Sequence, residues 1–199
     1  MPKVRTESEA QKSPMAVIVS LLRGVNVGGH HKIKMDALRA LYESLGLRGA
    51  QTFIQSGNVV FRTSERDLAK LATRIENAIE RSFGFRPDVI LRSASELRET
   101  IVRNPFAARR DIDPSKLLVT FLARDPGPEA RDAILSMKTD PEQLGFIGRE
   151  LYIYFPNGMA RSKFPWPAIE KTLKLPGTGR NWNTVMKLTE MAERMEGGQ

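Results

Sequence analysis

The order of strand and helix patterns in the first half of the chain most constrains its fold. Short apolar runs are typical of strands, and apolar residues recurring every three or four positions are typical of helices. One apolar run is followed by a helical pattern, two apolar runs flanking Ser56-Gly57-Asn58, a second helical pattern and a last apolar run. This βαββαβ order is the ferredoxin-like pattern and predicts an antiparallel sheet. The strand patterns lie at residues 17–22, 52–54, 59–61 and 89–91, and the helix patterns at 35–45 and 68–83.

The second half begins in the same way, with a strand run at 117–122, a helical pattern and a hairpin. A short helix, a turn at 176–179 and a last amphipathic helix follow, which gives the order βαββα. We therefore expect an α+β fold with two ferredoxin-like (βαββαβ-type) halves and antiparallel sheets. The expected division is a disordered N-terminal extension at 1–14, a first ferredoxin-like subdomain at 15–104, a linker at 105–116 and a second α+β subdomain at 117–196.

The glycine-rich loop between the first strand and the first helix is the strongest candidate for a site. Residues 23–34 contain three cations and no acid. Glycine lets backbone N–H groups approach a ligand, and a helix N-terminus adds unpaired donors and partial positive charge. The loop lacks a Walker A ending, and a glycine-rich crossover needed for tight packing is the alternative. The candidate ligand-binding residues are Arg23, Gly24, Asn26, Gly28, Gly29, Lys32 and Lys34.

Two further segments supply candidate ligand-binding residues. Ser56 and Asn58 belong to the hairpin turn, which we expect at the same end of the sheet as the loop. Ser56 has no evident general base, so a turn is the better interpretation than a nucleophile. Arg180, Asn181 and Asn183 precede the last helix, where Arg180 could meet an anion. The alternative there is that an asparagine caps the helix.

The formal net charge of +8 is concentrated in two segments. Residues 23–34 carry +3 and residues 161–187 carry +5, so the rest of the chain is formally neutral. If these segments meet in space, an anionic partner is expected, and we predict that Arg23, Lys32 and Arg180 share one face. Nucleic-acid binding would then be weak, sequence-independent and salt-dependent. The alternative is that these cations only solvate the surface.

The composition excludes several kinds of chemistry. The chain has no cysteine, which rules out disulfides and thiolate catalysis. Its only histidines are the adjacent His30 and His31, whose side chains point apart on an extended segment, so we expect no metal site. No cofactor and no catalytic residue can be assigned. No apolar run reaches the length of a membrane span, and we expect a cytoplasmic protein without a membrane partner. The sequence does not predict the oligomeric state.

Several separate blocks of sequence also resemble a known family. They are LLRGVNVGG at 21–29, Lys-Ile-Lys-Met at 32–35, QSGNVVF at 55–61 and RNWNTV at 180–185. In this order they resemble the bacterial family called domain of unknown function 1697, over residues 16–193. The resemblance implies an α+β fold with ferredoxin-like halves. It implies no activity, because the family has no established one.

These observations favour a protein that binds an anionic ligand at the glycine-rich loop. The ligand would be a nucleotide, a phosphorylated metabolite or a nucleic acid. One alternative is an enzyme acting on a phosphate- or carboxylate-bearing small molecule, in which Arg23 and Arg180 stabilise charge. The other is a protein-interaction module without small-molecule chemistry.

Overall fold

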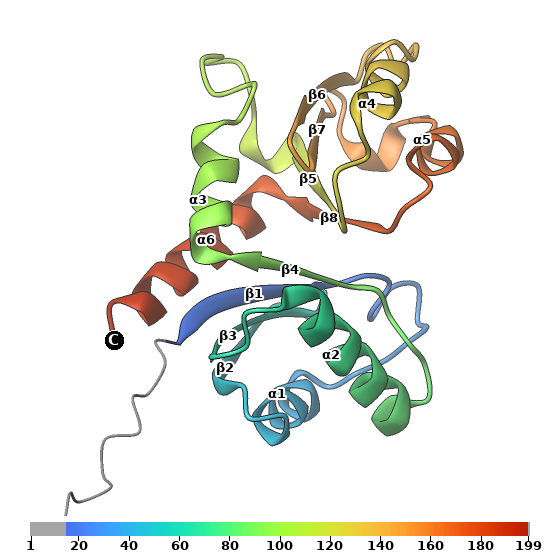
Figure 1. Ribbon diagram of the computed structural model, residues 1–199. Coiled ribbons are helices and arrows are strands. Elements are labelled where there is room, and N and C mark those ends of the chain that lie inside the picture. Colours follow the sequence, from blue (N-terminus) through green and yellow to red (C-terminus); the bar gives the residue numbers. More distant parts are fainter. Residues whose placement is uncertain (1–14, 199) are drawn as a thin grey trace, which may run out of the picture.

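The computed structural model describes residues 15–198, which form two four-stranded antiparallel sheets flanked by helices (Figure 1). The strand order is β2-β3-β1-β4 in the first sheet and β6-β7-β5-β8 in the second. Both orders are those of a ferredoxin-like βαββαβ unit, which confirms the predicted fold class. The extension predicted at residues 1–14 lies outside the described residues.

The first half follows the predicted order closely. Its first strand, AVIVSLL, is buried on both faces except at its first residue, as its continuous apolar run indicates. Asp67 caps the second helix by accepting a hydrogen bond from the Lys70 N–H, and Gly84 ends it in the left-handed conformation. The elements are β1 Ala16–Leu22, α1 Met35–Ser44, β2 Arg48–Phe53, β3 Asn58–Thr63, α2 Leu68–Phe83, β4 Val89–Ser93 and α3 Ala94–Val102.

The second half is a complete βαββαβ unit, so the predicted turn at 176–179 is wrong. Residues Gly177–Asn181 form the edge strand β8, which pairs with β5. The sequence GTGRN lacks the apolar residues typical of strands, so its pattern resembles a turn. The remaining elements are β5 Leu117–Leu122, α4 Pro128–Leu135, β6 Gln143–Ile147, β7 Glu150–Tyr154, α5 Trp166–Leu173 and α6 Trp182–Glu196, with short 3₁₀ turns at Pro114–Lys116 and Met159–Arg161.

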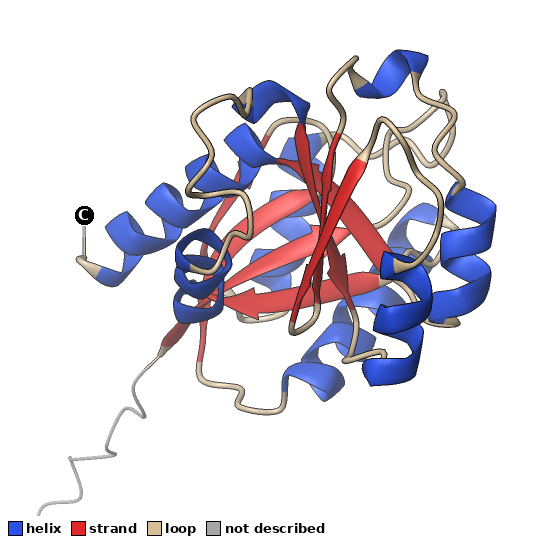
Figure 2. Ribbon diagram, turned by 90° about the horizontal axis from the view of Figure 1, so that it is seen from above, coloured by secondary structure: helices blue, strands red, loops and turns tan. Residues whose placement is uncertain are grey.

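The elements are arranged in layers around three apolar clusters. The two sheets face each other, and Figure 2 shows the strands of one sheet crossing those of the other. The inner faces of both sheets, with α3 and α6, form the central cluster. Helices α1 and α2 cover the outer face of the first sheet, and α4 and α5 cover that of the second. The boundary between subdomains stays a prediction; α6 follows the second sheet but packs on β1 and β3 of the first.

A pair of buried arginines occupies equivalent positions in the two halves. Arg92 on β4 pairs with Val19 of β1, and Arg180 on β8 pairs with Val119 of β5. The side chains of Arg92 and Arg180 cross from their own sheet to the other. Each donates to the carbonyl of the last residue in the other half's first strand. The Nη2 of Arg92 lies 2.7 Å from the Leu122 oxygen, and the Nη2 of Arg180 lies 2.8 Å from the Leu22 oxygen.

The two arginines differ in what else they bind. The Nε of Arg92 donates to the Glu150 carboxylate at 2.9 Å, forming a buried ion pair. The equivalent Nε of Arg180 donates to the neutral Asn58 amide oxygen. Burial lowers the pKa of Arg180 to about 10, so it remains charged at neutral pH. Its other four N–H donors bond to Thr178 Oγ1 at 2.7 Å and to the carbonyls of Gly179 at 2.8 Å, Leu22 at 2.8 Å and Ser56 at 3.0 Å.

The substitution Arg180→Met is expected to lower the free energy of unfolding by about 3 kcal/mol or more. Methionine fills the space but leaves the Ser56 carbonyl and the Asn58 amide oxygen without the donors of Arg180, and the Leu22 carbonyl keeps only the 3.3 Å bond from Thr178 Oγ1. Each buried acceptor that loses its donor costs about 1–3 kcal/mol. Arg180→Lys should also destabilise the protein, because an ammonium cannot replace the forked set of donors. Urea denaturation followed by circular dichroism measures both.

The matched control is Arg98→Met, which removes an exposed ion pair with Glu196. Such pairs contribute about 0–1 kcal/mol. If Arg180→Met is no more destabilising than this control, the hydrogen bonds of Arg180 do not hold the halves together.

Candidate anion-binding site

The glycine-rich loop is held in one conformation by the side chain of Asn26. Asn26 has a positive φ of 56°, a conformation that asparagine tolerates better than most residues. Its Oδ1 accepts from the Ile33 N–H at 2.9 Å, and its Nδ2 donates to the Ile33 carbonyl at 3.0 Å. The same Nδ2 donates to the Gln55 carbonyl at 2.8 Å, which ties the loop to the β2–β3 hairpin. The loop is therefore closed and anchored before any ligand arrives.

His31 has a packing role in the same loop. Its ring stacks on Phe85 with centroids 4.3 Å apart, and its Nδ1 lies 3.2 Å from the Gly24 carbonyl oxygen. His30 is exposed at the loop surface. Within residues 15–198 no group of three His, Asp or Glu side chains is placed to hold a metal ion. Among the described residues, no carboxylate is hydrogen-bonded to either imidazole ring, as would be expected for a histidine that acts as a general base.

A cavity of about 670 Å³ opens between this loop, the hairpin and the start of α1. We call it the loop cavity. Helix α1 begins beside it, and its N-cap residue Lys34 provides no side-chain hydrogen bond to the first turn. The first-turn N–H groups therefore lack the side-chain acceptor that usually satisfies them. The lining residues are Asn26, Gly29, Lys32, Ile33, Lys34, Met35, Asp36 and Gln55.

The charges around the loop cavity favour an anion. Lys32 and Lys34 are exposed, and neither forms an ion pair with any carboxylate in residues 15–198. The one acid in the lining, Asp36, lies 3.2 Å from the Arg39 guanidinium. Two lysines without acidic partners thus stand beside the open end of a helix, whose dipole adds to their positive potential.

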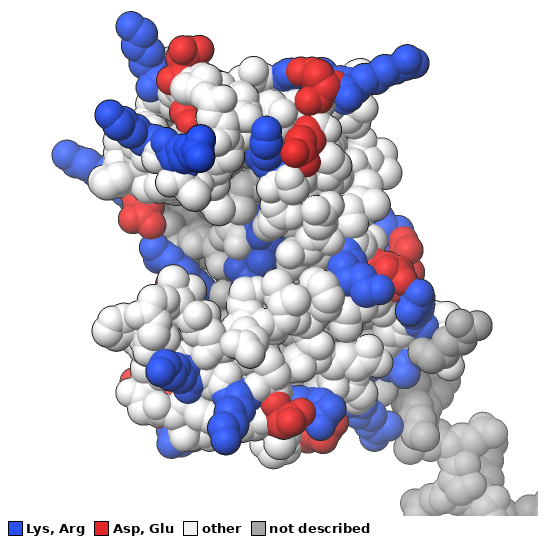
Figure 3. All heavy atoms as spheres, turned by 180° about the vertical axis from the view of Figure 1, so that it is seen from behind, with Lys and Arg blue, Asp and Glu red and all other residues white. Residues whose placement is uncertain are grey.

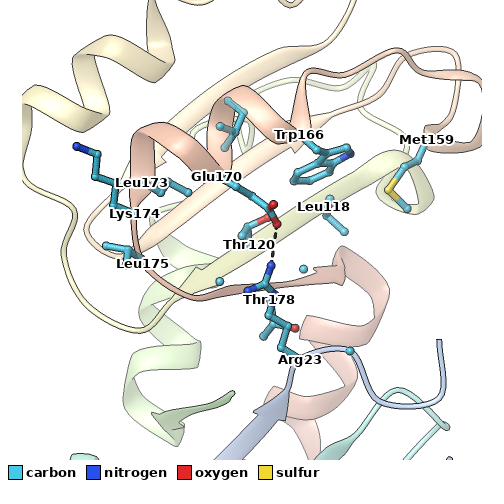
Figure 4. Close-up of a pocket in the computed structure, with 14 residues that line it drawn as sticks. Arg23, Leu118, Thr120, Met159, Trp166, Glu170, Leu173, Lys174, Leu175 and Thr178 are labelled. Atoms are coloured by element: carbon cyan, nitrogen blue, oxygen red, sulfur yellow. Dashed lines mark hydrogen bonds and ion pairs between the residues drawn. The ribbon is translucent and has the colours of Figure 1, made fainter. Parts of the chain in front are cut away.

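Arg23 does not belong to this cavity. Figure 4 shows it extending from the end of β1 toward α5, where its Nη2 lies 2.8 Å from Glu170 Oε1. Arg23 and Gly24 line a second cavity of about 610 Å³ between α5 and the second sheet. We call it the α5 cavity. The three predicted cations therefore do not line one cavity, because Lys32 lines the loop cavity, Arg23 lines the α5 cavity and Arg180 is buried with its donors bonded. Their placement on one face stays a prediction.

The remaining candidates serve the fold. Asn58 is fully buried and donates to Ser56 Oγ at 2.8 Å and to the Phe53 carbonyl at 3.0 Å. Asn58 and Arg180, whose donors are all used, are therefore buried structural groups rather than ligand contacts, and the half-buried Ser56 belongs to the same hydrogen-bonded turn.

Asn181, Asn183 and Gly28 are the remaining predicted ligand-binding residues. The Asn181 side chain accepts from the Asn183 N–H at 3.0 Å, so it caps α6, as the alternative interpretation predicted. Its Nδ2 also donates to the Ser115 carbonyl at 2.7 Å. Neither asparagine lines the loop cavity. Gly28 is exposed at the loop tip with a φ of 59°, and only Asn26, Gly29, Lys32 and Lys34 of the predicted residues line the loop cavity.

Basic side chains do not form one continuous patch on the face seen in Figure 3. Lys and Arg are spread over both halves there, separated by uncharged surface and mixed with Asp and Glu. Many arginines of the chain are in ion pairs, such as Arg86 with Glu76 at 2.8 Å. On this face the concentration of charge along the sequence therefore does not become one basic patch.

The sequence interpretation missed Arg92 and Thr120. Arg92 directly follows the apolar run Val-Ile-Leu of β4. A charged residue at the end of a buried strand pattern could have indicated a buried cation. Thr120 lies inside the buried strand LLVTFL, where a lone hydroxyl was the signal. Both signals are weak, because strands commonly carry such residues at their edges.

Comparisons with known proteins identify a family but no activity. The family model described as "Protein of unknown function (DUF1697)" matches residues 15–152. A search of curated proteins finds no match. The conserved bacterial protein SP0830 from Streptococcus pneumoniae has a similar solved structure, with a TM-score of 0.70 and 24% identity over 90% of this chain and 99% of that chain. At this identity the likeness concerns the fold. Among the described residues, no helix is both long and apolar enough to cross a membrane.

The substitution Asn26→Asp is expected to lower the free energy of unfolding by about 2 kcal/mol. Aspartate retains the acceptor for the Ile33 N–H but loses the two hydrogen bonds that Nδ2 donates, and a carboxylate then faces two carbonyl oxygens. Urea denaturation gives the change, and amide exchange at Ile33 shows whether the loop has opened. Asn183→Asp is the control, since its exposed side chain stands in the first turn of α6 and an acid there is favourable. Equal effects of the two changes would contradict the anchoring role of Asn26.

Proposed function

The chain belongs to the family described as protein of unknown function DUF1697, and we propose that it binds a small anionic ligand in the loop cavity. The ligand is a phosphorylated metabolite or a nucleotide. The observation that carries the proposal is the open N-terminus of α1, whose N-cap Lys34 gives no side-chain hydrogen bond, at the wall of a 670 Å³ cavity. Cavities of about 300–1,000 Å³ are the usual size for small-molecule sites.

Two features support this proposal beyond the helix end. The ammonium groups of Lys32 and Lys34 would add charge-assisted hydrogen bonds to phosphate oxygens. The Asn26 anchor fixes the loop in advance, so little conformational entropy is lost when the ligand binds. The Gln55 side chain, also in the lining, would supply a neutral donor for a sugar or base.

An enzymatic role has less support. Among the residues lining the loop cavity, the only acid is Asp36, which is paired with Arg39, and there is no histidine, serine or cysteine. Catalysis of acyl or phosphoryl transfer needs a positioned nucleophile or base. We therefore propose binding without assigning a reaction. The predicted cytoplasmic location stays a prediction from the sequence.

The substitution Lys34→Ser is expected to weaken phosphate and nucleotide binding at least tenfold while leaving the fold as stable or more stable. Lys34 already has the extended backbone of an N-cap, with φ −69° and ψ 134°. A serine there would accept a hydrogen bond from the first turn, which contributes about 0.5–2 kcal/mol. It would also occupy the donors that the ligand needs and remove one positive charge. Isothermal titration with inorganic phosphate and AMP measures binding, and thermal denaturation measures stability.

Lys32→Gln should weaken binding without changing stability, and Lys70→Gln should change neither, because Lys70 is exposed on α2 away from the cavity. The protein should bind phosphate and AMP more tightly than single- or double-stranded DNA or RNA at moderate salt. Tighter binding of nucleic acid, with a steep loss as salt rises, would instead indicate a nucleic-acid surface. Absence of phosphate and AMP binding in the wild type would overturn the proposal.

A further inference from the structure

Thr120 is a buried polar side chain without a partner. It is only 7% exposed, and its Oγ1 has no hydrogen-bond partner among the described residues. The equivalent position of the first half is Ser20, because Ser20 pairs with Leu91 across β1 and β4 as Thr120 pairs with Gly179 across β5 and β8. Ser20 Oγ lies 2.7 Å from the Tyr42 hydroxyl, so its hydrogen bond is made. The second half lacks this partner.

The second half also lacks side chains that fill the first. On β4, Val89 and Leu91 are buried in the cluster beneath α1 and α2. The equivalent residues of β8, which pair with Leu122 and Thr120, are Gly177 and Gly179. Two apolar side chains present in one half are therefore missing in the other. A large residue at either glycine would not fit unchanged, because the β5 side chains already lie close to both positions.

The covering helix is shorter as well. Helix α5 has 8 residues, whereas its counterpart α2 has 16. The α5 cavity of about 610 Å³ lies at this place, between α5, β5 and β8. Its apolar walls are formed by Leu118, Met159, Trp166, Ile169, Leu173 and Leu175.

Two cations, Arg23 and Lys174, stand at the rim of the α5 cavity. Arg23 pairs with Glu170 of the lining at 2.8 Å and, outside the lining, with Asp88 at 3.5 Å. The Arg23–Glu170 ion pair crosses the opening in Figure 4, with both side chains substantially exposed. Exposed ion pairs contribute only about 0–1 kcal/mol, so a ligand carboxylate can replace Glu170 as the partner of Arg23 at little loss. A bidentate carboxylate matches the guanidinium fork.

We propose that the α5 cavity binds a small aromatic monocarboxylic acid that also carries a hydroxyl group. The aromatic body packs against Trp166 and the apolar walls beneath the short helix α5. The carboxylate binds Arg23 at the opening. The hydroxyl bonds to Thr120 Oγ1, as the Tyr42 phenol bonds to Ser20 in the first half. This site is independent of the loop cavity, with which it shares no lining residue.

Trp166 provides a direct reporter of binding. The chain has two tryptophans, so Trp182→Phe leaves Trp166 as the sole one. In this background we would titrate 4-hydroxybenzoate, 4-hydroxyphenylacetate and 3-(4-hydroxyphenyl)propanoate, which span three distances between hydroxyl and carboxylate. At least one acid should give a saturable fluorescence change below about 10 mM, a concentration that detects affinities weaker than millimolar. Its neutral amide should bind at least tenfold more weakly.

The substitution Thr120→Val tests the contribution of the Thr120 hydroxyl to ligand binding without changing the shape of the side chain. Valine has nearly the same shape, so the unliganded protein should be as stable as the wild type or more stable, because the unpartnered hydroxyl is gone. The best acid should bind about tenfold more weakly to this variant, whereas its analogue without the ring hydroxyl should bind equally to both proteins. Arg23→Gln should weaken every acid and leave the amides unchanged.

Lys171→Gln is the control for charge, since Lys171 is exposed on α5 outside the cavity lining. It should bind all probes as the wild type does. Failure of all three acids to change the Trp166 fluorescence would overturn the proposal, as would equal binding of acids and amides. Unchanged binding of the hydroxyl-bearing acids to Thr120→Val would also overturn the proposal. Phosphate binding at the loop cavity should persist in Thr120→Val, so the two proposals can fail separately.

Discussion

The exchange of buried arginines between the sheets is the constraint on which the rest of the structure depends. Each guanidinium reaches from the fourth strand of one half to the carbonyl that ends the first strand of the other, at Leu22 or Leu122. A strand end normally has carbonyls that water must satisfy, and here they are covered by the opposing sheet. The arginines donate hydrogen bonds to these buried carbonyls and so replace the water that would otherwise bind them. The bond from Arg180 to the Leu22 carbonyl also holds the end of β1, directly before the glycine-rich loop.

The two halves share their topology but differ in how completely they fill it. In the first half, a long α2 and the side chains of Val89 and Leu91 close the outer face of the sheet, and the Ser20 hydroxyl is paired. In the second, the covering helix α5 is short, the α5 cavity lies beside it, and the Thr120 hydroxyl is unpaired. Interiors are usually close-packed, and buried polar atoms are usually bonded. Both departures at one place point to a ligand more than either would alone.

Sequence periodicity was sufficient for most of the fold and insufficient for the site. The strands at 17–22 and 117–122 were predictable because their apolar runs are long and both faces are covered. Strand β8 was not, since Gly177 and Gly179 have no side chains to show a pattern and only the neighbouring β5 makes them a strand. Arg180 was assigned to a ligand because sequence alone does not show whether a charge is buried. In the fold its guanidinium is buried and donates to the Asn58 amide oxygen, which is far away in the chain.

The loop illustrates why an anchored backbone and an open donor set belong together. Backbone N–H groups of the loop bond within the loop itself, from Asn26 to the His31 carbonyl at 3.2 Å and from His30 to the Val27 carbonyl at 3.1 Å. The Asn26 side chain adds bonds to Ile33 and to the hairpin, so the donors left for a ligand are those at the start of α1. His31 adds to the same effect by stacking on Phe85. A site that is rigid before binding loses less entropy when the ligand arrives, which is how weak individual hydrogen bonds become a usable affinity.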